Sequence, residues 1–127
     1  MSPFKPKKST LVIGASTKPY RYSYRAIQML REAGHPVSAY GLRTGEVAGV
    51  SIHTQTEALT SQEFDTVTLY VGPKNQGDLL PWLLQLKPRR VIFNPGTENS
   101  ELAQALRENG IEPVFACTLV MIGTQQY

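Results

Sequence analysis

The chain has 127 residues, a length that fits one domain of about 100–200 residues, so we expect a single domain over residues 1–127. Hydrophobic residues make up 41% of it and charged residues 18%, which excludes a disordered tail because this composition can form a core. The formal net charge of +3 is compatible with nucleic acid, but no nucleic-acid-binding motif supports that partner. No apolar run approaches the roughly 20 residues of a membrane-spanning helix, so we expect no membrane partner either.

The first eight residues form a short basic arm with lysines at Lys5, Lys7 and Lys8. The arm lacks the apolar stretch and cleavage site of a secretion signal, so we expect a soluble cytoplasmic protein. Cys117 is the only cysteine, which excludes an internal disulfide. The two histidines cannot form a structural zinc site without other strong ligands.

Strand-like and helix-like segments alternate in the first third of the chain. Thr10–Ile13 predicts a strand that ends at Gly14. Tyr22–Glu32 predicts a helix, because apolar residues recur there at helical spacing and Pro36 prevents its continuation. Val37–Tyr40 predicts the second strand.

The middle of the chain contains a weak strand and a strong one. Val50–Ile52 is short and half polar, so we expect it at a sheet edge. Thr56–Thr60 predicts a helical turn. Thr66–Val71 is rich in β-branched and aromatic residues and is the strongest strand prediction in the chain, and Gly72 and Pro73 end it.

The last third repeats the alternation. Asp78–Leu86 predicts a buried helix, and Arg90–Phe93 predicts a strand. Asn99 or Ser100 is expected to cap the next helix, before a final strand over about 112–116.

This order predicts an α/β fold: a single Rossmann-like, doubly wound, mostly parallel sheet with helices on both faces. In such sheets ligands bind outside the carboxyl ends of the strands, near the point where the strand order reverses. The rule selects four segments, which are residues 14–18, 41–43, 71–76 and 94–97.

The first segment can bind a phosphate. Gly14 lets the backbone approach a ligand, and amides at the start of a helix can face an anion. Ser16 and Thr17 add hydroxyls, and Lys18 adds positive charge. An ordinary strand-to-helix turn with a capping hydroxyl is the competing interpretation. The segment matches neither the glycine spacing of dinucleotide-binding folds, because Ala15 and its neighbours replace the glycines, nor the P-loop.

The second segment, residues 41–43, bears on which ribose the ligand would carry. An NAD-binding fold has an acidic residue near the end of its second strand, whereas this chain has Gly41, Leu42 and Arg43 there. An arginine at this point indicates a phosphorylated ribose, as in NADP or coenzyme A, and disfavours NAD. A surface arginine without a ligand is the alternative.

The remaining candidates lie at the ends of the two later strands. Gly72 and Pro73 let a flat adenine lie against the backbone, or simply end the strand. Gln76 either reaches the ligand or caps a helix. The last candidates form a turn in which the first residue can hydrogen-bond its own backbone, and they are Asn94, Pro95 and Gly96.

Three stretches carry a family resemblance, and they are Val12–Ser16 with Tyr22–Tyr24, Phe93–Asn99 and Ala116–Met121. With them the chain resembles the stand-alone CoA-binding domain family, whose fold also forms the N-terminal CoA-binding domain of succinyl-CoA synthetase α subunits. The resemblance covers nearly all of the sequence, from Thr10 to about Gly123.

The resemblance implies a ligand and its contacts. Residues 15–18 would wrap the CoA diphosphate, Arg43 would take the place of a basic residue at the nucleotide end, and residues 71–73, including Val71, would line the adenine. The synthetase's phosphorylated histidine has no counterpart. His35 precedes the second strand at its amino end, and His53 is expected beyond an edge segment. Catalysis is therefore not implied.

We expect non-catalytic binding of coenzyme A or an acyl-CoA. A small NADP-dependent reductase is an alternative, although the chain has no room for a substrate domain. A CoA-sensing adaptor for a protein partner is another, and a homodimer is open because small α/β domains often dimerise. Cys117 fits a small buried side chain better than a reactive thiol. The titratable candidates form no recognisable nucleophile–base pair, and they are Lys18, Lys74, Asp78, Glu98 and Cys117.

Overall fold

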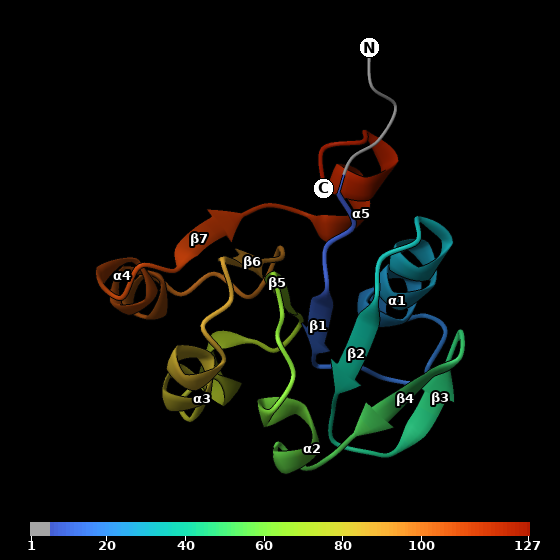
Figure 1. The fold of residues 1–127 in the computed structure, drawn as a ribbon, viewed down its shortest axis with the longest axis horizontal. Helices are drawn as coiled ribbons and strands as arrows, with labels where there is room; N and C mark the ends of the chain where they lie inside the picture. Colours follow the sequence, from blue (N-terminus) through green and yellow to red (C-terminus); the bar gives the residue numbers. More distant parts are fainter. Residues whose placement is uncertain (1–5) are drawn as a thin grey trace.

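The computed structural model describes residues 6–127, so Met1–Lys5 of the predicted basic arm lie outside the described residues. These residues form a seven-stranded sheet in the order β3-β4-β2-β1-β5-β6-β7, with helices on both faces (Figure 1). Every neighbouring pair is parallel except β3 and β4. The predicted Rossmann-like, mostly parallel α/β fold is confirmed.

The strands are short and mostly match the apolar runs of the sequence. Three of them have the predicted bounds, because each run of strand-forming residues ends at a glycine, a proline or a polar turn residue. The strands are β1 (Thr10–Ile13), β2 (Val37–Tyr40), β3 (Gly45–Val47), β4 (Val50–His53), β5 (Thr66–Leu69), β6 (Arg90–Phe93) and β7 (Glu112–Phe115).

The expectation that Val50–Ile52 forms a sheet edge is wrong. β4 lies between β2 and β3, and β3 is the edge strand. β3 was not predicted, because it has only three residues and begins with a glycine. It folds back through Ala48 and Gly49, whose φ angles of 50° and 80° match the tight hairpin turn that suits twisted strands. β3 thus pairs with the side of β4 that we expected to be an open sheet edge.

The helices are α1 (Tyr22–Glu32), α2 (Glu57–Thr60), α3 (Leu79–Leu86), α4 (Ser100–Glu108) and α5 (Thr118–Gly123), with a 3₁₀ turn η1 (Pro73–Asn75). Asn99 caps α4, since its Oδ1 accepts the Leu102 amide at 3.1 Å. α5 was not predicted, because the β-branched residues Thr118, Val120 and Ile122 make up half of its six positions. No helix within residues 6–127 is long and apolar enough to cross a membrane.

The core has two layers, one on each face of the sheet. Alternate residues of β1 point to opposite faces, so Leu11 and Ile13 pack under α2, α3 and α4, while Val12 packs under α1 and α5. All four residues of β1 are buried. β1 is therefore the central strand of the molecule, and the loop that leaves it lies in the middle of one sheet edge (Figure 1).

Candidate functional site

The strand order reverses beside β1. The chain passes from β1 to β2 on one side and later places β5 on the other, and β1 pairs in parallel with both. Loops diverge at such a point, which is where ligands bind in this class of sheet. Because the strands are parallel, all four predicted segments lie at one edge. We call residues 14–18, 41–43, 71–76 and 94–97 the carboxyl edge.

The start of the loop after β1 is fixed to β2. The amides of Gly14 and Ala15 both donate to the carbonyl oxygen of Tyr40, at 2.9 and 3.0 Å. These amides therefore face the sheet rather than a ligand. The expectation that Ala15 wraps a phosphate with its amide does not fit this geometry, because that donor already has an acceptor.

The next three residues, Ser16, Thr17 and Lys18, provide hydrogen-bond donors and a positive charge. Within the described part of the chain, the amides of Ser16 and Thr17 donate no hydrogen bond, and Lys18 is exposed. The Lys18 amide donates to Ser16 Oγ at 3.1 Å, which holds the loop in a tight turn. α1 begins only at Tyr22, and no side chain caps its first turn. Ser16, Thr17 and Lys18 thus present donors beside the positive end of a helix, an arrangement that attracts anions.

Two glycines allow three loops to meet in backbone contact. Gly14 has a φ of +96°, and a Cβ there would lie 2.8 Å from the carbonyl carbon of Tyr70 after β5. A Cβ at Gly41 would overlap the carbonyl oxygen of Ala15. The loops after β1, β2 and β5 can therefore approach one another only because both positions lack a side chain.

The rim near the end of β2 is exposed and positively charged. Arg43 is exposed, and it makes no ion pair or hydrogen bond with any other residue in the range 6–127. Leu42 beside it is 98% exposed, Tyr20 on the loop after β1 is 73% exposed, and Tyr22 at the start of α1 is 69% exposed. Large apolar side chains without cover commonly mark contact with a ligand or partner.

Gln76 is buried and has a structural role. Its Nε2 donates to the carbonyl oxygens of Val71 at 2.9 Å and Thr97 at 2.8 Å, and its Oε1 accepts from Asn99 at 3.0 Å. Only 3% of its surface is exposed. The side chain therefore ties the loop after β5 to the loop after β6. The predicted direct contact with a ligand does not fit, since both amide protons already have acceptors.

Asn94 is the second buried amide at this edge. Its Nδ2 donates to Thr68 Oγ1 at 2.6 Å and to the Leu69 carbonyl oxygen at 2.8 Å, and its Oδ1 accepts the Thr118 amide at 2.8 Å. We expected this side chain to bond its own backbone, and that expectation is wrong. Asn94 instead joins the ends of β5 and β6 to the start of α5.

The other predicted residues on this side lie at the surface. Pro73 is exposed, Val71 and Gly72 are partly buried, and Pro95 and Gly96 are exposed. Pro73 borders a surface cavity of about 360 Å³ between α3 and α4. These residues offer flat backbone and ring surface rather than charge.

Sequence reasoning missed Tyr70, which follows β5 at the point where the strand order reverses. Its hydroxyl is buried and has no hydrogen-bond partner within residues 6–127. The neighbouring hydroxyls of Thr68 and Thr118 bond each other at 2.8 Å instead. Burial raises the pKa of Tyr70 well above its usual value, so the phenol stays neutral at ordinary pH. The predicted strand Thr66–Val71 included Tyr70, whereas β5 ends at Leu69. No local sequence signal marks that earlier end.

His53 was also placed incorrectly by the sequence. Because β4 pairs with β2, His53 lies opposite Tyr40 at the carboxyl edge, and its carbonyl oxygen accepts the Gly41 amide at 2.9 Å. His35 lies at the amino end of β2, as expected from its position before that strand.

Catalytic groups are not brought together in the described chain. Within residues 6–127, no hydrogen bond or ion pair joins any two of the titratable candidates, and no group of three or more His, Cys, Asp or Glu could hold a metal. Cys117 is partly buried just before α5.

The sequence model of a family described as "CoA binding domain" matches residues 8–123. The chain belongs to the CoA-binding domain family. The match covers every strand and all four segments of the carboxyl edge. No curated protein matches the chain.

Solved structures share the fold of this CoA-binding domain. A crystal structure described as an uncharacterized protein is 46% identical with a TM-score of 0.91, covering 97% of this chain and all (100%) of that chain. A hypothetical protein from Pyrococcus horikoshii OT3 is 24% identical with a TM-score of 0.83, over 93% of this chain and 83% of its own. The dinucleotide-forming acetyl-coenzyme A synthetase 1 of Ca. Korarchaeum cryptofilum, solved with phosphate and ADP, is 14% identical with a TM-score of 0.70, over 87% of this chain and 26% of that chain. The last two likenesses concern the fold alone.

Proposed function

We propose that this protein binds coenzyme A or an acyl-CoA at the carboxyl edge and performs no chemistry on it. The observation that carries the proposal is the pair of unused amides at Ser16 and Thr17, beside the Lys18 ammonium and the uncapped start of α1. A diphosphate is recognised by clustered N–H donors and positive charge. Family membership supplies the ligand to which that diphosphate belongs.

The ribose end would lie at the end of β2. Arg43 is exposed there without a partner among residues 6–127, and a guanidinium binds a phosphate through two parallel hydrogen bonds. Coenzyme A carries a phosphate on its ribose, whereas dephospho-CoA lacks it. We infer that Arg43 distinguishes the two.

The adenine would lie against Gly72 and Pro73. No atom lies within 4 Å of the position a Cβ would take at Gly72, so a flat ring can approach the backbone there. Pro95 and Gly96 are exposed on the neighbouring loop and would border the same ligand. Gln76 and Asn94 would act indirectly, by holding these two loops in place.

Isothermal titration calorimetry with CoA, dephospho-CoA and NADP tests the proposal. We expect CoA to bind most tightly. In Arg43→Gln the CoA affinity should fall about tenfold or more, the effect of one charge-assisted hydrogen bond, while the dephospho-CoA affinity should hardly change. Arg107→Gln, an exposed change on α4, is the matched control.

Equal affinities for CoA and dephospho-CoA in the natural sequence would remove the role of Arg43. Tighter binding of NADP than of CoA would favour the reductase alternative. The absence of chemistry is tested separately by incubating the protein with acetyl-CoA and following both masses. Release of free CoA, or an acetyl group on Cys117 that is lost in Cys117→Ser, would contradict it.

A further inference from the structure

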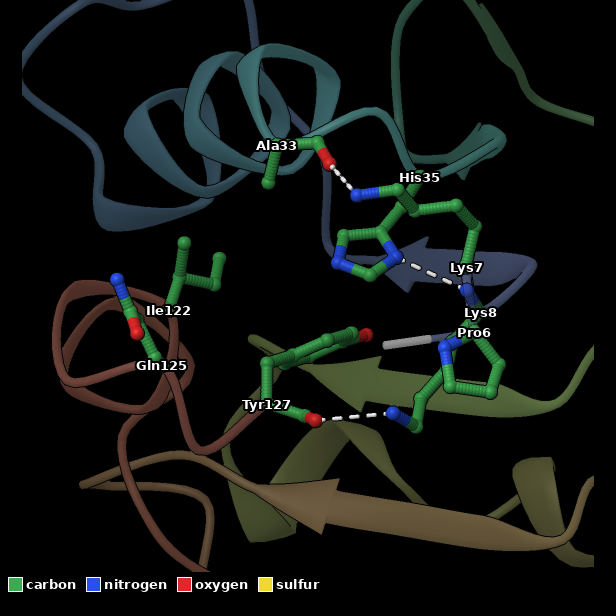
Figure 2. Close-up of a pocket in the computed structure, with 8 residues that line it drawn as sticks. All are labelled: Pro6, Lys7, Lys8, Ala33, His35, Ile122, Gln125 and Tyr127. Carbon is green, nitrogen blue, oxygen red and sulfur yellow. Dashed lines mark hydrogen bonds between the residues drawn. The ribbon is translucent and has the colours of Figure 1, made fainter. Parts of the chain in front are cut away.

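A cavity lies at the opposite edge of the sheet, where the parallel strands begin. Its volume is about 250 Å³, and Lys7, Ala33, His35, Ile122 and Tyr127 are among the residues around it (Figure 2). The N-terminal segment, the end of α1 and the residues after α5 meet there. The cavity is therefore separate from the carboxyl edge by the full length of the strands.

One wall of the cavity is fixed by Tyr127. Its hydroxyl lies 2.6 Å from Thr10 Oγ1, and the guanidinium carbon of Arg90 lies 4.6 Å from its ring centroid. The His35 ring lies 4.9 Å from the same ring. Tyr127 is only 8% exposed, so the wall is held by contacts on several sides. A cavity with such a wall keeps its shape without a ligand.

The protonation of His35 follows from one hydrogen bond. The Lys8 amide donates to His35 Nδ1 at 2.9 Å, so that nitrogen carries no proton and the neutral ring carries it on Nε2. In Figure 2 the second ring nitrogen faces the space toward Ala33, Ile122 and Tyr127. Within residues 6–127 it donates to no other group. The cavity thus contains an N–H donor directed inward.

Positive charge exceeds negative charge around this donor. The charged groups that act on His35 are Lys7, Lys8 and Arg90 on the positive side and Asp65 alone on the negative side. Asp65 is already bonded to Arg89 at 3.1 Å. Burial first, and then the three cations, lower the pKa of His35 below its usual value. One terminal nitrogen of Arg90 has no hydrogen-bond partner within the described residues.

We propose that this cavity binds a small oxyanion, a carboxylate or a phosphate group, to which His35 Nε2–H donates a hydrogen bond. The Lys7 ammonium, which donates to the Ala33 carbonyl oxygen at 2.7 Å, supplies charge at the same wall and has further protons to donate. At about 250 Å³ the cavity lies below the roughly 300–1,000 Å³ of sites for larger organic ligands, so a small anion fits it better than a nucleotide does. The site is additional to the one proposed for CoA.

NMR titration of the two histidine side chains tests this site. The pKa of His35 is measured in acetate, in phosphate and in chloride at one ionic strength. A bound anion stabilises the imidazolium, so the pKa of His35 should rise with acetate or phosphate and saturate, opposite to the effect of the cations. The anion, acetate or phosphate, that saturates the pKa shift at the lower concentration is the better ligand of the cavity. His53 lies at the carboxyl edge, so it reports any anion that binds there, and its shift should saturate at a different concentration from that of His35.

Matched variants connect the shift to the cavity. Lys7→Gln should weaken the apparent anion affinity about two- to five-fold, the effect of one partly solvated charge. Lys87→Gln removes the same charge near the start of β6, outside the cavity, and should leave the affinity unchanged. Circular dichroism checks that both variants are folded. The proposal is overturned if the His35 pKa in acetate and phosphate equals that in chloride, if both histidines shift alike, or if the two lysine variants behave alike.

Discussion

On the β1–β2 side of the carboxyl edge, the amides of Ser16 and Thr17 and the guanidinium of Arg43 have no partner within residues 6–127. On the β5–β6 side, the amide side chains of Gln76 and Asn94 are buried, and their polar groups are bonded to other parts of the protein. The four segments had looked equivalent, since each follows a parallel strand. The structure thus separates a side whose polar donors have no partner from a side whose buried amide side chains hold the loops in place.

This division has a physical reason. A buried amide without partners is costly, at about 1–3 kcal/mol for each unsatisfied group, so buried polar side chains must be bonded inside the protein. Exposed donors can exchange water for a ligand instead. The partnered side fixes the distance between loops, and the unpartnered side supplies the charge. Substitutions on the β5–β6 side should therefore mainly lower the free energy of unfolding. Substitutions of exposed groups on the β1–β2 side should mainly lower the affinity for CoA.

The largest effect is expected for Asn94→Ala. The change leaves groups of Thr68, Leu69 and Thr118 without their partner in a buried place, and should lower the free energy of unfolding by about 2–4 kcal/mol. Urea denaturation measures it. Asn109→Ala removes an exposed side chain with one bond and should cost much less. Similar losses in the two variants would mean that the Asn94 network does not support the edge.

An intermediate effect is expected for Gly41→Ala. The added methyl group would overlap the Ala15 carbonyl oxygen and push the loops after β1 and β2 apart. We expect the free energy of unfolding to fall by about 1–3 kcal/mol and the CoA affinity to fall with it. Gly123→Ala, where the new Cβ has no neighbouring atom within 4 Å and which lies outside the carboxyl edge, should keep its stability and its CoA affinity. Thermal unfolding and calorimetry of the pair decide whether close loop contact matters for binding.

The smallest effect on stability is expected for Lys18→Gln. Lys18 is exposed, so unfolding should change by no more than about 0.5 kcal/mol, while the dissociation constant for CoA should rise about two- to five-fold. Lys74→Gln makes the same change in η1 on the β5 side and should leave the CoA affinity unchanged. If Lys74→Gln weakens binding as much as Lys18→Gln, the charge that holds the diphosphate does not come from the β1–β2 side alone.

Local sequence signals were sufficient for most elements. β1, β2 and β6 have the predicted bounds, because a run of strand-forming residues and the turn residue that ends it are both recognisable within a few positions. Tyr22–Glu32 was predicted in full from its helical spacing. β3 was missed, since three residues beginning with Gly45 have almost no strand signal of their own. It exists because β4 offers it a partner.

The roles of single residues were less predictable. The position of Ser16 after a central strand was enough to make it a candidate. The partners of Gln76 and Asn94 lie as far as 21 to 26 positions away in the chain, and only the folded sheet brings them together. His53 was misplaced because the pairing of β4 was misjudged. Sequence pattern thus located the edge, and the pairing of distant strands decided which of its side chains are available.

The residues after β7 connect the two ends of the molecule. Thr118 is bonded to Asn94 at the carboxyl edge, whereas Tyr127 contacts Thr10 at the start of β1, 117 positions earlier in the chain. During synthesis the first strand is made early, but this contact cannot form until residues 118–127 have left the ribosome. Contacts between such distant positions slow folding, because a long loop must close before they form. The contact between Tyr127 and Thr10 is therefore among the last contacts of β1 to form.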